Sequence, residues 1–161
     1  MKKTFSLIIA LAMILALVPA VTVHAEVEQI AKWTMNGTTT TTKAGATIGE
    51  ITAVGTGAIG TVGTNASNYA LTCNGWTLNG YFQFVFDGTG YGNYNAVFQM
   101  QRSATGPQDF KIETSTDLTS WYPVTGTVPA VGTGATAFNI NLNSAMDGSA
   151  TVYVRLSMPQ A

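Results

Sequence analysis

Residues Gly75 to Val124 read GWTLNGYFQFVFDGTGYGNYNAVFQMQRSATGPQDFKIETSTDLTSWYPV. This stretch contains three apolar or alternating runs of strand length, Tyr81–Phe86, Asn95–Gln101 and Asp109–Ser115. Clusters of Gly, Asp, Asn, Pro, Ser and Thr separate the three runs. Strand-length runs bounded by residues of these types predict an antiparallel sheet.

Two runs beyond this stretch, 135–142 and 151–157, alternate apolar and polar residues. Alternation with a period of two predicts strands with one buried and one wet face. We find no helical periodicity after residue 25. The predicted strands are 81–86, 95–101, 109–115, 122–128, 137–142 and 151–157, with less regular ones before them. Seven or eight strands predict an all-β fold, an antiparallel β-sandwich with jelly-roll (galactose-binding-like) topology.

The residues before Gly75 are less regular. Glu28–Met35 is predicted as the first strand. The tract 36–68 is rich in Thr, Gly and Ala, which favours short, irregular strands such as Thr47–Val54. A disordered linker is the alternative interpretation of this tract.

Residues 1–25 have the pattern of an export signal. Lys2 and Lys3 precede an apolar run, and Val23-His24-Ala25 is a small-x-small cleavage site. The apolar run is too short to span a bilayer, which takes about 20 residues; a retained anchor is the alternative. We therefore expect a secreted or cell-surface protein with no membrane segment after cleavage.

We expect residues 26–161 to form a single β-sandwich domain. The last predicted strand ends at Ser157, close to the final residue, Ala161. We therefore expect the domain to be truncated at its C-terminal end, with a final strand or further domains following in the full-length chain.

The composition argues against several functions. Cleavage after Ala25 leaves five basic and eight acidic residues, with no basic cluster, so nucleic acid is not an expected partner. The one histidine, His24, leaves with the signal, which excludes His-based triads and imidazole zinc sites. Lys111 and Glu113 share one strand face, which favours a solvated face over a catalytic pair. We therefore expect no enzymatic activity.

Strand alternation brings the loops 87–94, 116–121 and 143–150 to one end of the sandwich, where we expect any ligand to bind. The candidate ligand-binding residues there are Tyr91, Asn93, Tyr94 and Trp121, and the candidate calcium ligands are Asp87, Asp117 and Asp147. Each has a structural alternative: the tyrosines can close the end, Trp121 can fill the core, and the Asp-Gly pairs 87–88 and 147–148 are common in turns.

Part of the chain resembles a known type of module. The resembling residues are Phe98, Arg102-Ser103-Ala104-Thr105-Gly106-Pro107, Asp109-Phe110-Lys111-Ile112, Ser115-Thr116-Asp117 and Trp121, with Ile30-Ala31-Lys32-Trp33-Thr34 near the start. They resemble the jelly-roll, carbohydrate-binding-like modules of large secreted bacterial surface proteins and of some extracellular nucleases and nucleotidases. Thr114 departs from the pattern where an aromatic is usual, and Leu118 replaces the turn glycine. The resemblance implies an accessory rather than a catalytic role.

Together these observations predict a secreted, non-catalytic module for glycan binding or cell-surface attachment. Its expected partner is a glycan or cell-wall polysaccharide, and calcium is the one cofactor considered. The alternatives are an accessory N-terminal domain of an extracellular hydrolase (nuclease, nucleotidase or glycosidase) and a purely structural spacer.

Overall fold

The computed structural model describes residues 28–34, 38–40, 51–57, 60–62, 70–124 and 130–158. The predicted signal 1–25, Met35 and the predicted strand residues 47–50 and 125–128 lie outside these ranges. The described elements are, in chain order, β1 (Lys32–Thr34), β2 (Thr38–Thr40), β3 (Thr52–Val54), β4 (Gly60–Val62), β5 (Ala70–Thr72), β6 (Tyr81–Phe86), β7 (Asn95–Met100), β8 (Lys111–Ser115), β9 (Tyr122–Pro123), β10 (Thr136–Asn141), the 3-10 turn η1 (Ser144–Met146) and β11 (Val152–Ser157). The described chain is thus essentially all-β, as predicted.

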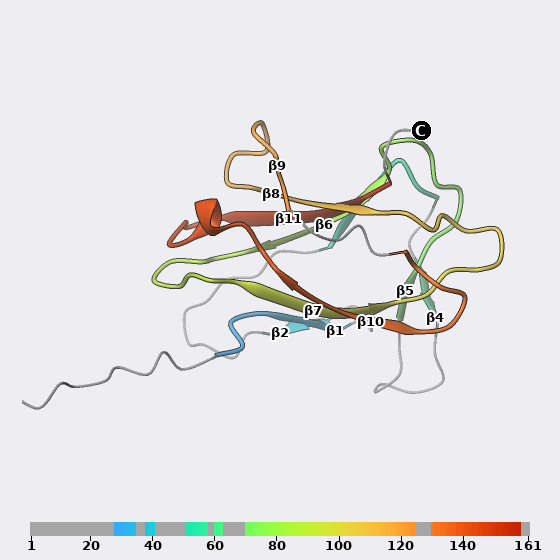
Figure 1. Cartoon of the computed structure of the whole chain (residues 1–161), viewed down its shortest axis with the longest axis horizontal. Coiled ribbons are helices and arrows are strands. Elements are labelled where there is room, and N and C mark those ends of the chain that lie inside the picture. Colours follow the sequence, from blue (N-terminus) through green and yellow to red (C-terminus); the bar gives the residue numbers. More distant parts are fainter. Residues whose placement is uncertain are drawn as a thin grey trace, which may run out of the picture.

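The strands form four antiparallel sheets. The largest has the order β3-β6-β11-β8-β9, and the others are the pairs β7-β10, β1-β2 and β4-β5. In Figure 1 the five-stranded sheet forms one layer, and β7 and β10 form the layer that faces it, with β1 and β2 on the same side. The arrangement is that of a β-sandwich.

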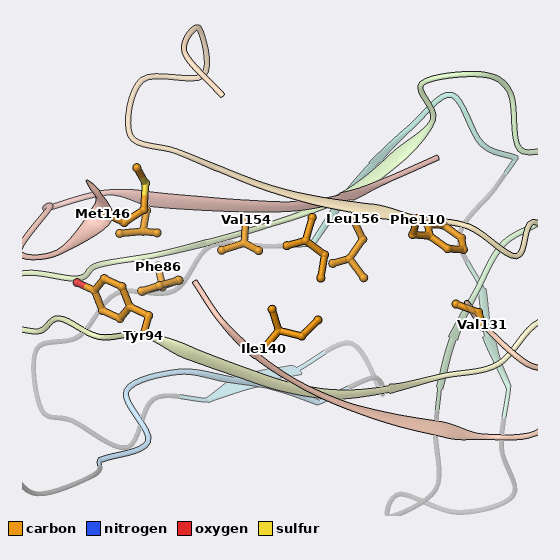
Figure 2. Close-up of a cluster of buried hydrophobic side chains, with 10 residues drawn as sticks. Phe86, Tyr94, Phe110, Val131, Ile140, Met146, Val154 and Leu156 are labelled. Carbon is orange, nitrogen blue, oxygen red and sulfur yellow. The ribbon is translucent and has the colours of Figure 1, made fainter. Parts of the chain in front are cut away.

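Alternation along the strands builds the core between these layers. On β7 the side chains of Ala96, Phe98 and Met100 are partly buried, while those between them are exposed. Figure 2 shows Val154 and Leu156 of one layer facing Ile140 of the other. The buried apolar residues are Phe86, Tyr94, Phe110, Ile112, Val131, Ile140, Met146, Val152, Val154 and Leu156.

Two tryptophans from the N-terminal half extend this core. The Trp33 ring lies edge-on to Phe84, with 5.4 Å between the ring centroids, which places β1 over the inner face of β6. The Trp76 ring lies edge-on to Phe82 (5.0 Å) and Phe110 (5.3 Å). Edge-to-face geometry is the favoured arrangement of aromatic pairs. The segment that carries Trp33 therefore packs against the same core as Gly75–Val124.

The predicted strand bounds are close to those of the structure for the long strands. Tyr81–Phe86 coincides with β6, and the predicted strand 95–101 is one residue longer than β7. The predicted strand 109–115 begins two residues before β8. Just ahead of it, the Val131 N–H donates to the Gln108 carbonyl at 2.8 Å. The predicted strand 122–128 corresponds, within the described residues, to the two-residue strand β9.

Candidate functional site

Two of the three predicted site loops, 87–94 and 143–150, lie against each other. The antiparallel register that pairs Phe86 with Val152 brings the end of β6 beside the start of β11. Backbone hydrogen bonds then join the loops, from the Gly88 N–H to the Ser149 carbonyl (3.0 Å) and from the Gly148 N–H to the Tyr91 carbonyl (2.7 Å). Strand alternation alone was sufficient to predict this pairing of loops.

The two tyrosines of this end hold the loop 87–94 together. Tyr94 is 6% exposed, its ring lies edge-on to Phe86 at 5.4 Å, and its hydroxyl lies 2.8 Å from the Gly88 carbonyl and 2.9 Å from that of Tyr91. Tyr91 is half-buried against the core, and its hydroxyl donates to Glu28 Oε2 at 3.0 Å. In this structure the Tyr94 ring offers no face to a ligand, and the geometry agrees with the end-closing alternative.

Trp121 lies apart from the two tyrosines, on the outer face of the five-stranded sheet. Its ring covers the Arg155 guanidinium, whose central carbon is 3.7 Å from the ring centroid, and its indole N–H donates to the Leu118 carbonyl at 3.1 Å. Arg155 also lies 5.3 Å from the Tyr81 ring centroid. Trp121 therefore does not fill the core. It holds the turn 116–120 against the sheet through a cation–π contact with Arg155.

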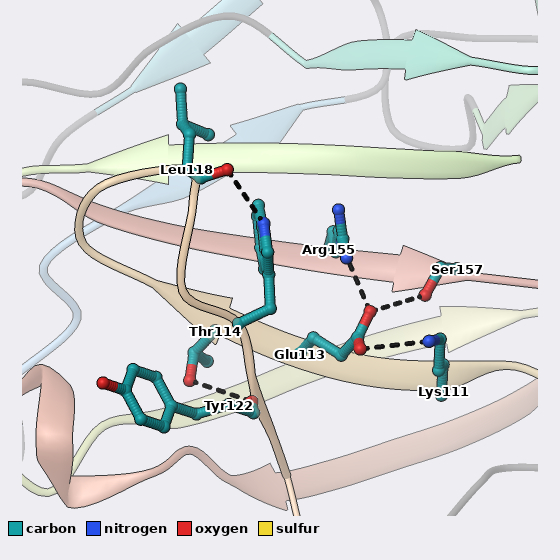
Figure 3. Close-up of polar contacts among 8 residues, drawn as sticks. Lys111, Glu113, Thr114, Leu118, Tyr122, Arg155 and Ser157 are labelled. Atoms are coloured by element: carbon teal, nitrogen blue, oxygen red, sulfur yellow. Dashed lines mark hydrogen bonds and ion pairs between the residues drawn. The ribbon is translucent and has the colours of Figure 1, made fainter. Parts of the chain in front are cut away.

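Beneath this turn the Glu113 carboxylate is 7% exposed, so the expectation of a solvated face is wrong for Glu113. Glu113 Oε1 lies 3.1 Å from Lys111 Nζ, and Oε2 accepts from Arg155 Nε at 3.0 Å and from Ser157 Oγ at 3.1 Å (Figure 3). Burial raises the pKa of Glu113, but the hydrogen bonds from Lys111, Arg155 and Ser157 and the Arg155 charge outweigh it, so the net pKa lies below its ordinary value.

The three candidate calcium ligands serve three separate structural roles. Asp87 Oδ1 accepts the Thr89 N–H at 2.8 Å, and Asp147 Oδ1 accepts the Asn93 N–H at 2.9 Å. The N–H groups of Ser120 and Thr119 lower the pKa of Asp117 to about 2. Within the described ranges no three Asp, Glu, His or Cys side chains lie close enough to hold one metal ion. In this structure the three candidate calcium ligands therefore do not come together at one point.

Asn93, the remaining candidate, is exposed and adopts a left-handed backbone conformation with a φ of 54°. Asparagine tolerates this region better than most residues, because its short polar side chain can bond locally. The bond from its N–H to Asp147 fixes the loop here. Its side chain lies at the surface of the end that the two loops form.

A depression of about 340 Å³ lies between the two layers, where the chain after β9 faces the end of β10. Among the described strands, β9 and β10 are outer strands of their sheets, so the depression opens between two sheet edges. Its lining residues are uncharged: Val124, Asn141, Leu142, Asn143 and Ser144. Two of them, Asn143 and Ser144, belong to the predicted site loop 143–150.

An exposed aromatic ring lies beside this depression. Tyr122 pairs with Thr114, and the Val124 N–H donates to the Ile112 carbonyl at 2.9 Å, so the pairing with β8 continues to Val124. Residues two apart on a strand share a face, about 7 Å apart. Tyr122 therefore lies on the same face as the lining residue Val124, and it is 43% exposed.

Sequence reasoning missed Tyr122, Val124, Asn141, Leu142 and Ser144 as site residues. A signal for them was present in Tyr122-Pro123, because a proline inside a strand marks an edge strand. An edge strand has one side without a neighbouring strand, so an aromatic residue there is only partly covered. What the sequence did not indicate is that the end of β10 lies opposite this edge.

At the other end of the sandwich, Arg102 fixes the Thr-Gly-Pro turn. Its guanidinium donates to the carbonyls of Val131 (2.8 Å), Ser103 (3.1 Å) and Ala104 (3.0 Å). The guanidinium is thus bound to backbone carbonyls of the turn and of the segment beside it. The Arg102 side chain is therefore engaged in holding the turn.

Comparison of the chain with protein-family models, curated proteins and solved structures finds no match. In the part of the chain that the structure describes, no helix has the length and hydropathy needed to cross a membrane.

Proposed function

We propose that this chain is a secreted, non-catalytic module that binds a glycan of a cell surface or cell wall, and that the glycan binds at the depression beside Tyr122. The finer topology we propose is a jelly roll. It is supported by β11 lying between β6 and β8 in one layer while β7 pairs with β10 in the other, since the chain then passes repeatedly from layer to layer.

The observation that carries this proposal is the combination of an exposed aromatic ring with uncharged polar groups. Tyr122 is 43% exposed, and the neighbouring depression presents two asparagines and a serine beside two aliphatic side chains. Sugars offer apolar C–H faces that lie flat on aromatic rings, and hydroxyls that need hydrogen-bond partners. Small-ligand sites have this mixture of apolar wall and few polar groups, at volumes from about 300 Å³ upward.

A glycan-array screen of the protein, with and without calcium, tests the proposal. Binding should be detected for at least one glycan class and should not require calcium. Tyr122→Ala should weaken that binding about tenfold or more, as expected when a central aromatic contact is removed. Leu118→Ala is the matched control, because Leu118 is similarly exposed (50%) on the same hairpin but outside the depression.

Three results would contradict the proposal. Absence of binding to every glycan would favour a structural spacer. Binding that survives Tyr122→Ala in a folded protein would place the ligand elsewhere. Hydrolysis of a glycan or a nucleotide substrate by the purified chain would contradict its non-catalytic character.

A further inference from the structure

The polar lining of the depression is biased towards hydrogen-bond donors. Asn143 Oδ1 accepts the Ala145 N–H at 3.0 Å, and Asn141 Oδ1 accepts from Asn95 Nδ2 at 2.8 Å. An asparagine side chain has one acceptor oxygen and an NH2 group with two donors. With its oxygen engaged inside the protein, the NH2 group of Asn143 is the part best able to meet a ligand. The Asn141 side chain lies with that of Asn139 on the exposed face of β10, where Asn95 Nδ2 donates to both.

The remaining lining consists of two aliphatic side chains and the hydroxyl of Ser144. Val124 and Leu142 are partly buried and pack against the core, so their positions are fixed by the fold. At about 340 Å³, the depression is near the lower limit for small-ligand sites. The lining suits a group that combines an acceptor with an apolar end, and the rest of the volume is left for the remainder of the ligand.

Resting on the proposed function, we infer that the depression recognises the acetamido group of an N-acetylated sugar. The acetamido carbonyl accepts from the NH2 group of Asn143, while the methyl group contacts Val124 and Leu142. The sugar ring then extends towards Tyr122. The acetamido group satisfies both the donor and the apolar wall.

Other sugar substituents fit this lining less well. A hydroxyl in the same place accepts a hydrogen bond but leaves Val124 and Leu142 without an apolar partner. A carboxylate accepts two hydrogen bonds, but none of the lining residues is a cation that compensates the loss of its hydration. The lining thus distinguishes an N-acetylated sugar from both a neutral unsubstituted sugar and an acidic one.

The test compares two trisaccharides that differ at the 2-position. Chitotriose carries an acetamido group on each ring where cellotriose carries a hydroxyl. Isothermal titration calorimetry of the protein should show chitotriose binding at least about tenfold more tightly, the effect of about one well-formed hydrogen bond. Trigalacturonate, the acidic probe, should bind no better than cellotriose.

Asn143→Asp tests the donor role with little change in shape. An aspartate oxygen still accepts the Ala145 N–H and keeps the η1 cap, while the second oxygen replaces the NH2 group and repels the acetamido carbonyl. Chitotriose affinity should fall about tenfold or more. Asn79→Asp is the matched control: it adds the same charge to an exposed position outside the lining, and should leave affinity within about twofold.

The outcomes separate this inference from the proposed function. Equal binding of chitotriose and cellotriose, or unchanged chitotriose binding by folded Asn143→Asp, overturns the acetamido inference and leaves the proposed function standing. Preference for trigalacturonate, or array binding confined to glycans without acetamido groups, also overturns it. Failure to bind any glycan overturns both.

Discussion

Replacing Glu113 with glutamine should destabilise the fold through one defined cluster. The carboxylate is 7% exposed and is held between Lys111, Arg155 and Ser157 at 3.0–3.1 Å. Glutamine keeps the shape of the side chain and one acceptor oxygen, which can still accept from Arg155 and Ser157. Its NH2 group then faces the Lys111 ammonium, which must turn to solvent.

We expect a loss of about 1.5–2 kcal/mol in the free energy of unfolding at pH 7. About 1 kcal/mol comes from the Arg155 bond, because a charge-assisted hydrogen bond becomes a bond to a neutral acceptor. About 0.5–1 kcal/mol comes from the ion pair with Lys111. This is the contribution of a surface ion pair, because the Lys111 side chain is 38% exposed.

The loss should depend on pH in a defined direction. The pKa of Glu113 is lowered in the folded state from its ordinary value of 4.5. The ionised carboxylate therefore contributes its full stability above pH 4.5, and this contribution is lost as the pH falls through the folded pKa. The difference between the wild type and Glu113→Gln should be constant from pH 6 to 8 and shrink below pH 4.5.

Urea unfolding at a series of pH values measures this difference directly. Asp109→Asn is the matched control, since it removes an exposed carboxylate outside the cluster and should change stability by less than about 0.5 kcal/mol. A loss below about 0.5 kcal/mol at pH 7, or one that persists unchanged at pH 2–3, would refute the assignment of Glu113 to a buried ionic cluster.

Further predictions concern backbone conformation and close contacts. Leu118 has a φ of 63°, and in this left-handed region a residue with a β-carbon strains the folded state by about 1–2 kcal/mol. Glycine removes this strain but costs about 0.5–1 kcal/mol, because it gives the unfolded chain more conformational freedom. Leu118→Gly should therefore raise the free energy of unfolding by about 0.5–1 kcal/mol. Leu78→Gly, at an exposed turn position without positive φ, should lower it by about 0.5–1 kcal/mol; the same sign for both variants in urea unfolding would contradict this account. Gly88→Ala would place a β-carbon against the Tyr94 hydroxyl and should cost about 1–3 kcal/mol in thermal unfolding, whereas Gly134→Ala, with nothing within 4 Å, should be neutral or stabilising by up to about 1 kcal/mol. An equal effect of the two alanines would show that the loop end is not packed as described.

The strands were predictable because their apolar residues alternate. In Tyr81–Phe86 and in 151–157, period-two patterning and the turn residues around it are sufficient to locate β6 and β11. The meeting of loops 87–94 and 143–150 follows from the same alternation. These are consequences of local sequence and of antiparallel pairing, which is why single-sequence reasoning reaches them.

The environment of individual side chains was less predictable, because it depends on what a distant segment covers. Alternation placed Glu113 on the outer face, and it lies there, but the turn after β8 folds back and Trp121 covers Arg155 beside it. Tyr94 was a candidate ligand-binding residue with end closing as its structural alternative, and the closing of its own loop buries it. Neither covering is visible in a local pattern.

The depression is the clearest example of this limit. It exists because the edge of one sheet, at Val124, lies opposite the end of β10 in the other layer. Alternation states which face a residue occupies but not how two layers align at their edges. The candidate site in the structure therefore lies at the side of the sandwich, whereas the sequence predicted it at the loop tips. The two share the start of the loop 143–150.

The most direct test of the central claim is an NMR titration of the isotopically labelled protein with a glycan that it binds. We predict that the backbone and side-chain amide signals that shift will be concentrated at Tyr122, Val124 and Asn141–Ser144, with the Asn143 side-chain NH2 among the largest. Shifts concentrated instead on the outer face of β7 and β10, around Val97 and Gln99, would contradict the claim that the depression is the binding site.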